Sequence, residues 1–161
     1  MKKLGLALMM LLLLGGCSRP AVTETVADAL PQAHYTVTFA VPEDASPSDD
    51  GSACTGPNGD YCIVAGAVDA ASLEDAVAQV SGFPAGTLDV IALQRGGMGE
   101  YRFAWSSAGE EGETVSCCAL CVRDGGYYAV TMTQRAGLGT QYAPVAEAVF
   151  ASIALEPDGI V

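Results

Sequence analysis

The sequence predicts an α+β fold, in which an antiparallel sheet of about six strands has two helices packed on it. Three observations support this fold class. Several segments alternate apolar and polar residues on a β-branched and aromatic background, glycine-rich dipeptides separate them, and two further segments repeat apolar residues at helical spacing. The chain has 161 residues, and residues 35–156 are long enough to form a single domain with its own core.

The N-terminal segment is typical of an export signal. Lys2 and Lys3 precede an apolar run from Leu4 to Leu14, and small residues follow this run. This order matches a secretory signal peptide, and the run is too short to span a bilayer comfortably. Residues 1–16 are therefore predicted to be removed.

The end of this segment, Leu14-Gly15-Gly16-Cys17, resembles the lipobox of bacterial lipoproteins. The resemblance implies that the thiol of Cys17 receives a diacylglycerol, that the peptide is cut before it, and that the new amine can be acylated, for example with palmitate. Two acyl chains hold a protein stably on a membrane. We therefore expect lipid attachment at Cys17 on the extracytoplasmic face of the cell membrane, with residues 17–34 as lipid anchor and flexible tether.

The first part of the domain reads as two strands and a loop. Tyr35–Val41 alternates and stops at Pro42, and Tyr61–Val68 is a second strand that could pair with the first. Between them, Glu43–Asp60 is rich in serine, proline, glycine and aspartate, which predicts a long surface loop without regular structure.

A short helix follows, with a signal at each end. Ser72 is suited to accept a hydrogen bond from a free N–H at the start of the helix, Asp75 suits the helix dipole, and Gly82 can take the left-handed closing conformation. The predicted buried stripe is formed by Leu73, Ala76, Val77 and Val80.

Four strands and a closing helix complete the predicted fold. Glycine-rich turns separate the strands, and Asp124-Gly125-Gly126 is a strong hairpin signal. Apolar residues recur at helical spacing from Tyr142 to Ile153, with Pro144 in the first turn. Residues 157–161 are expected to form a tail. The four predicted strands are Leu88–Gln94, Glu100–Ser106, Thr114–Val122 and Tyr127–Gln134.

Cysteines are concentrated in "SCCALC", residues 116–121. In a strand, Cys117 and Cys121 point to one face and Cys118 to the other, and apolar neighbours on both faces predict an interior strand with cysteine as a small hydrophobic residue. Cα atoms four residues apart in a strand are separated by roughly 13 Å, so Cys117 and Cys121 cannot form a disulfide with each other.

Export permits oxidation, and the turn-rich segment between Cys54 and Cys62 favours a disulfide between these two residues. A bridge from one of them to the segment 117–121 and free thiols are both left open. A thiolate metal site built from Cys118, Cys121, Cys54 and Cys62, or a redox dithiol, would need a tight turn or a helix N-terminus, which this strand does not offer.

Other candidate chemistry is sparse. His34, the single histidine, lies at the end of the tether, and no nucleophile motif accompanies it. The loop Glu43–Asp60, called the acidic loop below, lacks the residue spacing of a calcium loop. A solvated loop is therefore expected, and weak calcium binding is the alternative. Aromatic residues on neighbouring strands are expected to be core, the alternative being a recognition surface near the arginines. We predict no catalytic residue, no metal and no cofactor.

The charge balance limits the choice of partners. The chain carries 19 acidic and seven basic residues, for a net charge of −12, and both lysines lie in the signal. Such a surface repels nucleic acid and favours cationic partners or solubility.

The order hairpin, helix, meander and closing helix is similar to the PsbP/Mog-like α/β fold. The segment "DGGYYAVTMTQRAGLGTQYAPVAEAVFASIAL", residues 124–155, resembles the ending of its bacterial lipoprotein members. This resemblance implies mostly non-enzymatic roles, such as extrinsic subunits of membrane complexes or binders of small GTPases. The sequence thus predicts an anchored, non-catalytic binding or accessory domain for a protein or small ligand of the envelope. The alternative is an envelope thiol or metal protein that uses Cys54, Cys62, Cys118 and Cys121.

Overall fold

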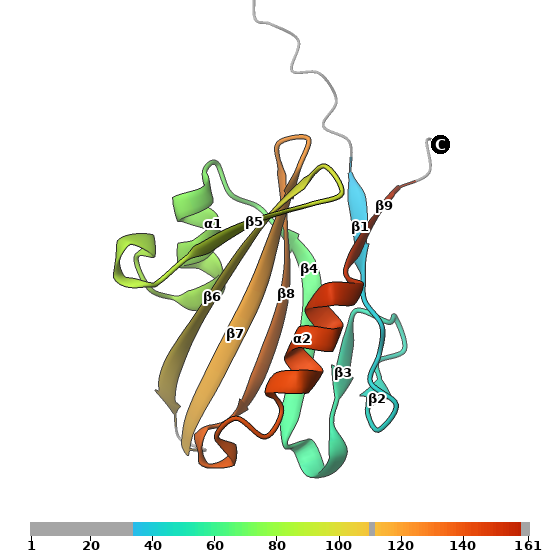
Figure 1. Cartoon of the computed structure of the whole chain (residues 1–161), viewed down its shortest axis with the longest axis vertical. Coiled ribbons are helices and arrows are strands. Elements are labelled where there is room, and N and C mark those ends of the chain that lie inside the picture. The colour runs from blue at the N-terminus through green and yellow to red at the C-terminus, as the bar shows by residue number, and fades with distance from the viewer. Residues whose placement is uncertain (1–33, 110–111, 159–161) are drawn as a thin grey trace, which may run out of the picture. The chain divides into compact units, whose positions relative to one another are not determined.

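A seven-stranded antiparallel sheet forms the centre of the structure (Figure 1). The computed structural model describes residues 34–109 and 112–158, which belong to one compact unit, Pro31–Val161. The strand order is β2-β3-β4-β8-β7-β6-β5. The strands are β2 (Ser46–Pro47), β3 (Ala53–Thr55), β4 (Tyr61–Val68), β5 (Ile91–Arg95), β6 (Met98–Gly109), β7 (Gly112–Arg123) and β8 (Gly126–Arg135).

Two tight turns with positive φ angles fix the register of the meander. Gly96 and Gly97 join β5 to β6 with φ of 57° and 79°, and Asp124 and Gly125 join β7 to β8 with φ of 49° and 80°. Two residues of positive φ make a type I′ turn, whose twist matches that of the flanking strands. The four strands predicted for this region are confirmed, and β6, β7 and β8 are longer than expected.

Helix α1 (Leu73–Ser81) covers one face of the sheet. Its start and end are those predicted, since the Ser72 hydroxyl accepts a hydrogen bond from the N–H of Asp75 at 3.1 Å and Gly82 closes the helix with φ of 77°. Ala76 and Val77 are buried against a cluster from the central strands that comprises Phe103, Cys118, Leu120 and Ala129.

Helix α2 (Ala143–Ser152) and a two-stranded ribbon of β1 (Tyr35–Thr38) and β9 (Ala154–Pro157) contribute to the larger core on the opposite face (Figure 1). The helices on the two faces confirm the α+β prediction. The suggested pairing of the first strand with Tyr61–Val68 is wrong, because β1 pairs with β9 from Tyr35–Pro157 to Thr38–Ala154. Apolar residues that α2 buries in this core are Ala146, Val149 and Phe150.

The acidic loop is more ordered than the sequence suggested. It contains β2, β3 and a short 3₁₀ turn, Pro57–Gly59. Asp50 accepts hydrogen bonds from the hydroxyl groups of Ser48 and Ser52 and from the N–H of Ser52, which lower the pKa of its carboxyl group to about 2. These bonds close the β2–β3 turn, and Cys54 supplies a buried side chain. Together they offset the poor strand propensity of the segment.

Strand β7 is the predicted interior strand. Ala119 and Cys121 are buried in the α2 core, whereas Cys118 and Leu120 are buried in the α1 core. The signal 1–16, the anchor residue Cys17 and most of the tether 17–34 lie outside the described residues. Within the described residues, no helix is long and apolar enough to cross a membrane.

Candidate functional site

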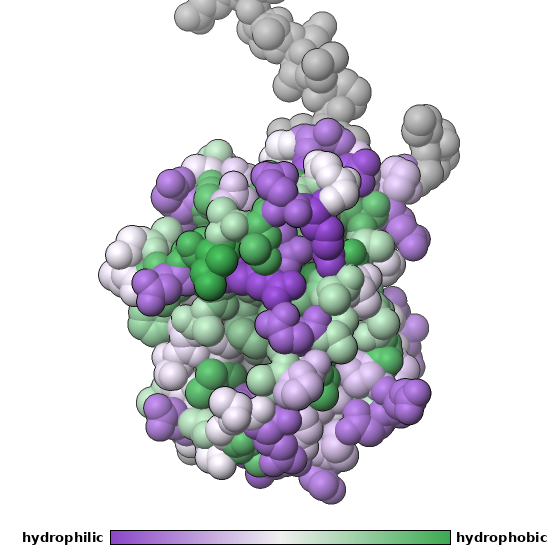
Figure 2. Space-filling view, viewed as in Figure 1, coloured by the Kyte–Doolittle hydropathy of each residue, from purple (hydrophilic) through white to green (hydrophobic). Residues whose placement is uncertain are grey.

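A groove lies between α2 and the β5–β6 part of the sheet; we call it the α2–β6 groove. Its volume is about 750 Å³. Figure 2 shows hydrophobic surface over β5 beside a band of hydrophilic residues. The residues that line the groove are Thr87, Leu88, Asp89, Ile91, Leu93, Arg102, Phe103, Ala104, Cys117, Cys118, Ala143, Ala146, Glu147 and Phe150.

The groove exists because strand lengths and side-chain sizes differ locally. Strand β5 pairs with β6 only from Ile91–Arg102 to Arg95–Met98, although β6 continues to Gly109. Between α2 and β6 the side chains of Ala104 and Ala146 are too small to fill the space. Ile91 and Leu93 consequently remain 62% and 40% exposed, unusually high values for large apolar side chains on one strand face.

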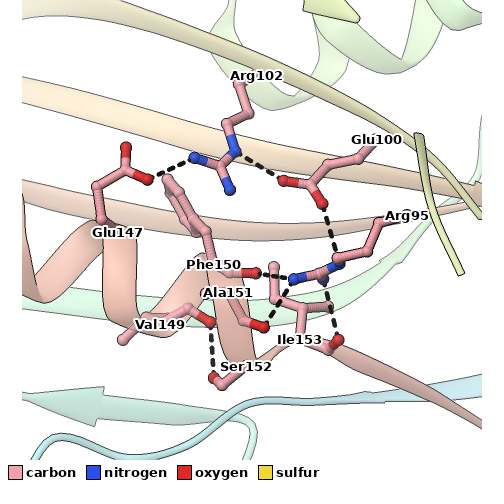
Figure 3. A network of polar contacts seen from close by, with 9 residues as sticks. All are labelled: Arg95, Glu100, Arg102, Glu147, Val149, Phe150, Ala151, Ser152 and Ile153. Atoms are coloured by element: carbon pink, nitrogen blue, oxygen red, sulfur yellow. Dashed lines mark hydrogen bonds and ion pairs between the residues drawn. The ribbon is translucent and has the colours of Figure 1, made fainter. Parts of the chain in front are cut away.

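Four charged side chains form a chain of contacts, and two of them, Arg102 and Glu147, line the groove (Figure 3). The carboxylate of Glu100 is 1% exposed and contacts Nε of Arg102 at 2.7 Å and Nε of Arg95 at 3.4 Å. Arg102 also contacts Glu147 on α2 at 2.6 Å, and its guanidinium lies 5.4 Å from the ring centroid of Phe150. The side chain of Glu147 is 69% exposed, so the network runs from the core to the surface.

Arg95 connects this network to the end of α2. Its guanidinium donates hydrogen bonds to the carbonyl oxygens of Phe150 and Ala151 at 2.8 Å and of Ile153 at 3.0 Å. Carbonyl groups at a helix C-terminus lack partners within the helix and carry partial negative charge, so a cation there is favourable. Arg95 therefore fixes the β5–β6 turn against the end of α2.

The cysteines are dispersed over the two cores. Cys54 and Cys121 are buried on the α2 side, Cys118 is buried on the α1 side, and Cys62 is exposed. Burial raises the pKa of Cys118 to about 12 and that of Cys121 to about 11. These four residues do not meet at one point, and in the described part of the chain no group of three potential ligands is placed to hold a metal ion.

The expected Cys54–Cys62 bridge is not present in the structure, where both thiols are free. Thr55 is the cross-strand partner of Cys62, and Cys54 is the partner of Ile63. Neighbouring residues of a strand point to opposite faces, so the two sulfur atoms lie on opposite sides of the sheet. A bond between them would require a different register of β3 and β4.

Other residues singled out in the sequence have mostly structural places. His34 is exposed, and its carbonyl accepts a hydrogen bond from the N–H of Asp158. Asp60 accepts a hydrogen bond from the hydroxyl of Tyr142 at 2.9 Å and pairs with Arg135. The aromatic residues divide between the two cores, with Tyr128 on the α2 side and Tyr101, Phe103, Trp105 and Tyr127 on the α1 side.

Glu100 and Glu147 were missed by sequence reasoning. Glu100 and Arg102 are two residues apart in one strand, so their side chains lie on the same face. This spacing was a signal that could have identified Glu100 as the partner of Arg102. No sequence signal identifies Glu147 as the partner of Arg102, because their proximity depends on how α2 packs on the sheet.

A scan against models of protein families and a search of curated proteins found no match. Among solved structures, the chain is similar to LpqN of Mycobacterium tuberculosis, a protein involved in cell envelope biogenesis, with 15% identity, a TM-score of 0.48 and coverage of 81% of this chain and 88% of that one. It is also similar to a protein of Bacteroides thetaiotaomicron VPI-5482, with 16% identity, a TM-score of 0.48 and coverage of 80% and 50%.

Proposed function

We propose that this protein is a lipoprotein anchored through Cys17 to the extracytoplasmic face of the cell membrane. Its folded part acts as a non-catalytic binding or accessory domain for another component of the envelope. The α2–β6 groove is the binding site, and it is the observation that carries the proposal.

The composition of the groove supports recognition. Apolar side chains on its walls supply contact area that is released from water on binding, and Glu147 and Asp89 at its rim supply polar selectivity. Two thiols line the groove, Cys117 and Cys118, and burial raises the pKa of the first to about 11 and that of the second to about 12. A thiol is nucleophilic only as thiolate, so this environment suits packing better than covalent chemistry.

Site-specific photocrosslinking in cells tests the proposal. A benzophenone amino acid placed at Ile91 should trap an envelope component, because this position lies on the groove wall. The matched control is Val64, which is also an exposed strand residue, with 52% exposure against 62% for Ile91, and does not line the groove. Equal products from both positions, or none from Ile91, would contradict the groove as the binding site for an envelope component.

A further inference from the structure

The outer edge of β6 is open next to the groove. Arg95 and Met98 flank a two-residue turn and are paired across it. In such a hairpin the flanking residues exchange hydrogen bonds, and every second residue along the strand repeats this pattern. Met98, Glu100 and Arg102 therefore direct their N–H and C=O groups towards β5.

Beyond Arg102 the backbone groups of β6 continue to alternate in direction, but no strand pairs with the side that faced β5. Ala104 and Ser106 direct their backbone groups to the side where β5 has already ended, since β5 begins at Ile91. Strand β7 pairs with the opposite edge of β6 from Gly99 to Gly109. Across residues 34–109 and 112–158, no hydrogen bond outside the β6–β7 ladder reaches the backbone of Ala104 or Ser106. An unpaired edge of this kind is a template for another strand.

The surroundings of this edge suit an added strand. The side chains of Ala104, Ser106 and Ala108 are small and exposed on the α2 face, so another backbone can approach closely. Thr87, Leu88 and Asp89 line the groove just before β5 starts, which places the groove opening beside the free edge. Alternate side chains of an added strand would therefore enter the groove.

We propose that the α2–β6 groove binds an extended segment of a partner protein, which adds as a strand to β6 at Ala104–Ala108. Alternate apolar side chains of this segment enter the groove, and its lysine or arginine side chains face Glu147 and Asp89. This inference rests on the proposed function and specifies its partner. It uses β-strand addition, in which backbone hydrogen bonds give affinity and side-chain pockets give specificity.

Charge determines which occupant is favoured. The four arginines of the described residues each form an ion pair with a carboxylate of the same chain, and the whole chain has a net charge of −12. A second copy would bring like charge to an acidic rim, whereas a basic segment is complementary to it. The partner is therefore a basic extended segment rather than another molecule of this protein.

The test selects peptides on the full-length chain in detergent. Random twelve-residue peptides displayed on phage are enriched against it, and hydrogen exchange is measured with the best synthetic peptide. We expect sequences that alternate apolar residues with lysine or arginine, and slower exchange at the amides of Ala104 and Ser106. The proposal would be overturned if acidic peptides or no peptides were enriched, or if the protein self-associated through this edge in a concentration-dependent way. Protection at Ala92 and Gln94 of β5, in place of β6, would also overturn it.

The variants Ser106→Pro and Ser106→Ala separate backbone pairing from side-chain contact. Proline removes the N–H on the open side, where it is not used by the β6–β7 ladder, whereas alanine keeps it. We expect Ser106→Pro to bind the peptide about tenfold more weakly than Ser106→Ala. In case the proline variant does not fold, the selected peptide methylated at alternate backbone nitrogens should bind the unchanged protein equally weakly. Strand addition is refuted if the two variants bind the peptide equally well. It is also refuted if the methylated peptide binds the unchanged protein as tightly as the unmethylated peptide does.

The two proposals fail separately. Crosslinking from Ile91 without exchange protection at β6 would keep the groove as the binding site and reject strand addition. Protection and peptide selection without any envelope product at Ile91 would leave strand addition standing and reject the envelope role.

Discussion

The carboxylate of Glu100 lies between the guanidinium groups of Arg95 and Arg102 and is almost fully buried. Burying a charge is costly unless it is paired and hydrogen-bonded. Glu100 meets both conditions, and it holds both arginines where they contact α2. The residue thus links the sheet to the helix through two side chains, in addition to the apolar packing of α2 on the sheet.

Glu100→Ala should lower the free energy of unfolding by about 2 kcal/mol, because it leaves two partly buried guanidinium groups without their shared carboxylate. The control Glu147→Ala removes an exposed carboxylate from the same network and should cost below about 0.5 kcal/mol. Urea denaturation measures both. Similar losses for the two variants would contradict the central role assigned to Glu100.

The buried thiols make stability depend on alkaline pH. Burial raises the pKa of Cys118 to about 12 and that of Cys121 to about 11, from an ordinary value of 9.0. Between pH 9 and pH 11 the unfolded chain loses these protons and the folded chain retains them, so unfolding becomes more favourable as the pH rises. We expect the contribution of these two thiols to the free energy of unfolding to be constant below pH 9 and to fall as the pH rises above 9.

Denaturation of the unchanged protein and of Cys118→Ala at a series of pH values from 7 to 11 checks this dependence. The variant should be less stable at pH 7 because of the cavity, but its stability should fall less steeply above pH 9. Parallel curves would show that Cys118 does not titrate as a buried thiol. Tyrosine ionisation contributes equally to both curves.

At the scale of elements, the sequence predicted the helices and hairpins whose ends contain capping or turn-forming residues. Ser72 and Gly82 bound α1, and Asp124-Gly125 closes the β7–β8 hairpin, because capping and positive φ depend on a few adjacent residues. The pairing of β1 with β9 was not predictable in this way. The two strands are four residues each and come from opposite ends of the domain, so their pairing depends on tertiary packing.

Glycine at the end of α1 provides a sharp test of this local chemistry. Gly82 has a φ of 77°, and Gly86 does not have a positive φ, yet an added Cβ would meet open space at both positions. Gly82→Ala should therefore cost about 1 kcal/mol from backbone strain alone, whereas Gly86→Ala should change stability by less than about 0.5 kcal/mol. Thermal unfolding of the two variants measures the difference, and equal effects would argue against the left-handed cap.

At the scale of the whole molecule, neither the groove nor the open edge was visible in the sequence. Both arise from a mismatch between the length of β5 and that of β6 and from small residues on two elements that are distant in sequence, such as Ala104 and Ala146. Periodicity identifies which face of a strand is apolar, but it does not reveal where a neighbouring strand stops. The candidate site therefore required the assembled fold.

The predicted anchor also concerns the molecule as a whole. Cys17→Ser should abolish labelling by palmitate and move the protein from the detergent phase to the aqueous phase in a Triton X-114 partition, because the lipid is the predicted attachment. The control Cys62→Ser removes an exposed thiol and should retain both properties. Membrane association of the Cys17 variant equal to that of the control would contradict lipid anchoring.

The three hydrogen bonds from Arg95 to the end of α2 have a kinetic consequence. They hold the β5–β6 turn and the helix in one arrangement before any partner arrives. A partner of the proposed site would then meet a largely preformed receptor, and little affinity would be lost to ordering the site. Association should follow a single exponential whose rate rises linearly with partner concentration and falls with ionic strength. For the proposed complex, the arginine that caps a helix would thereby remove a slow step from association.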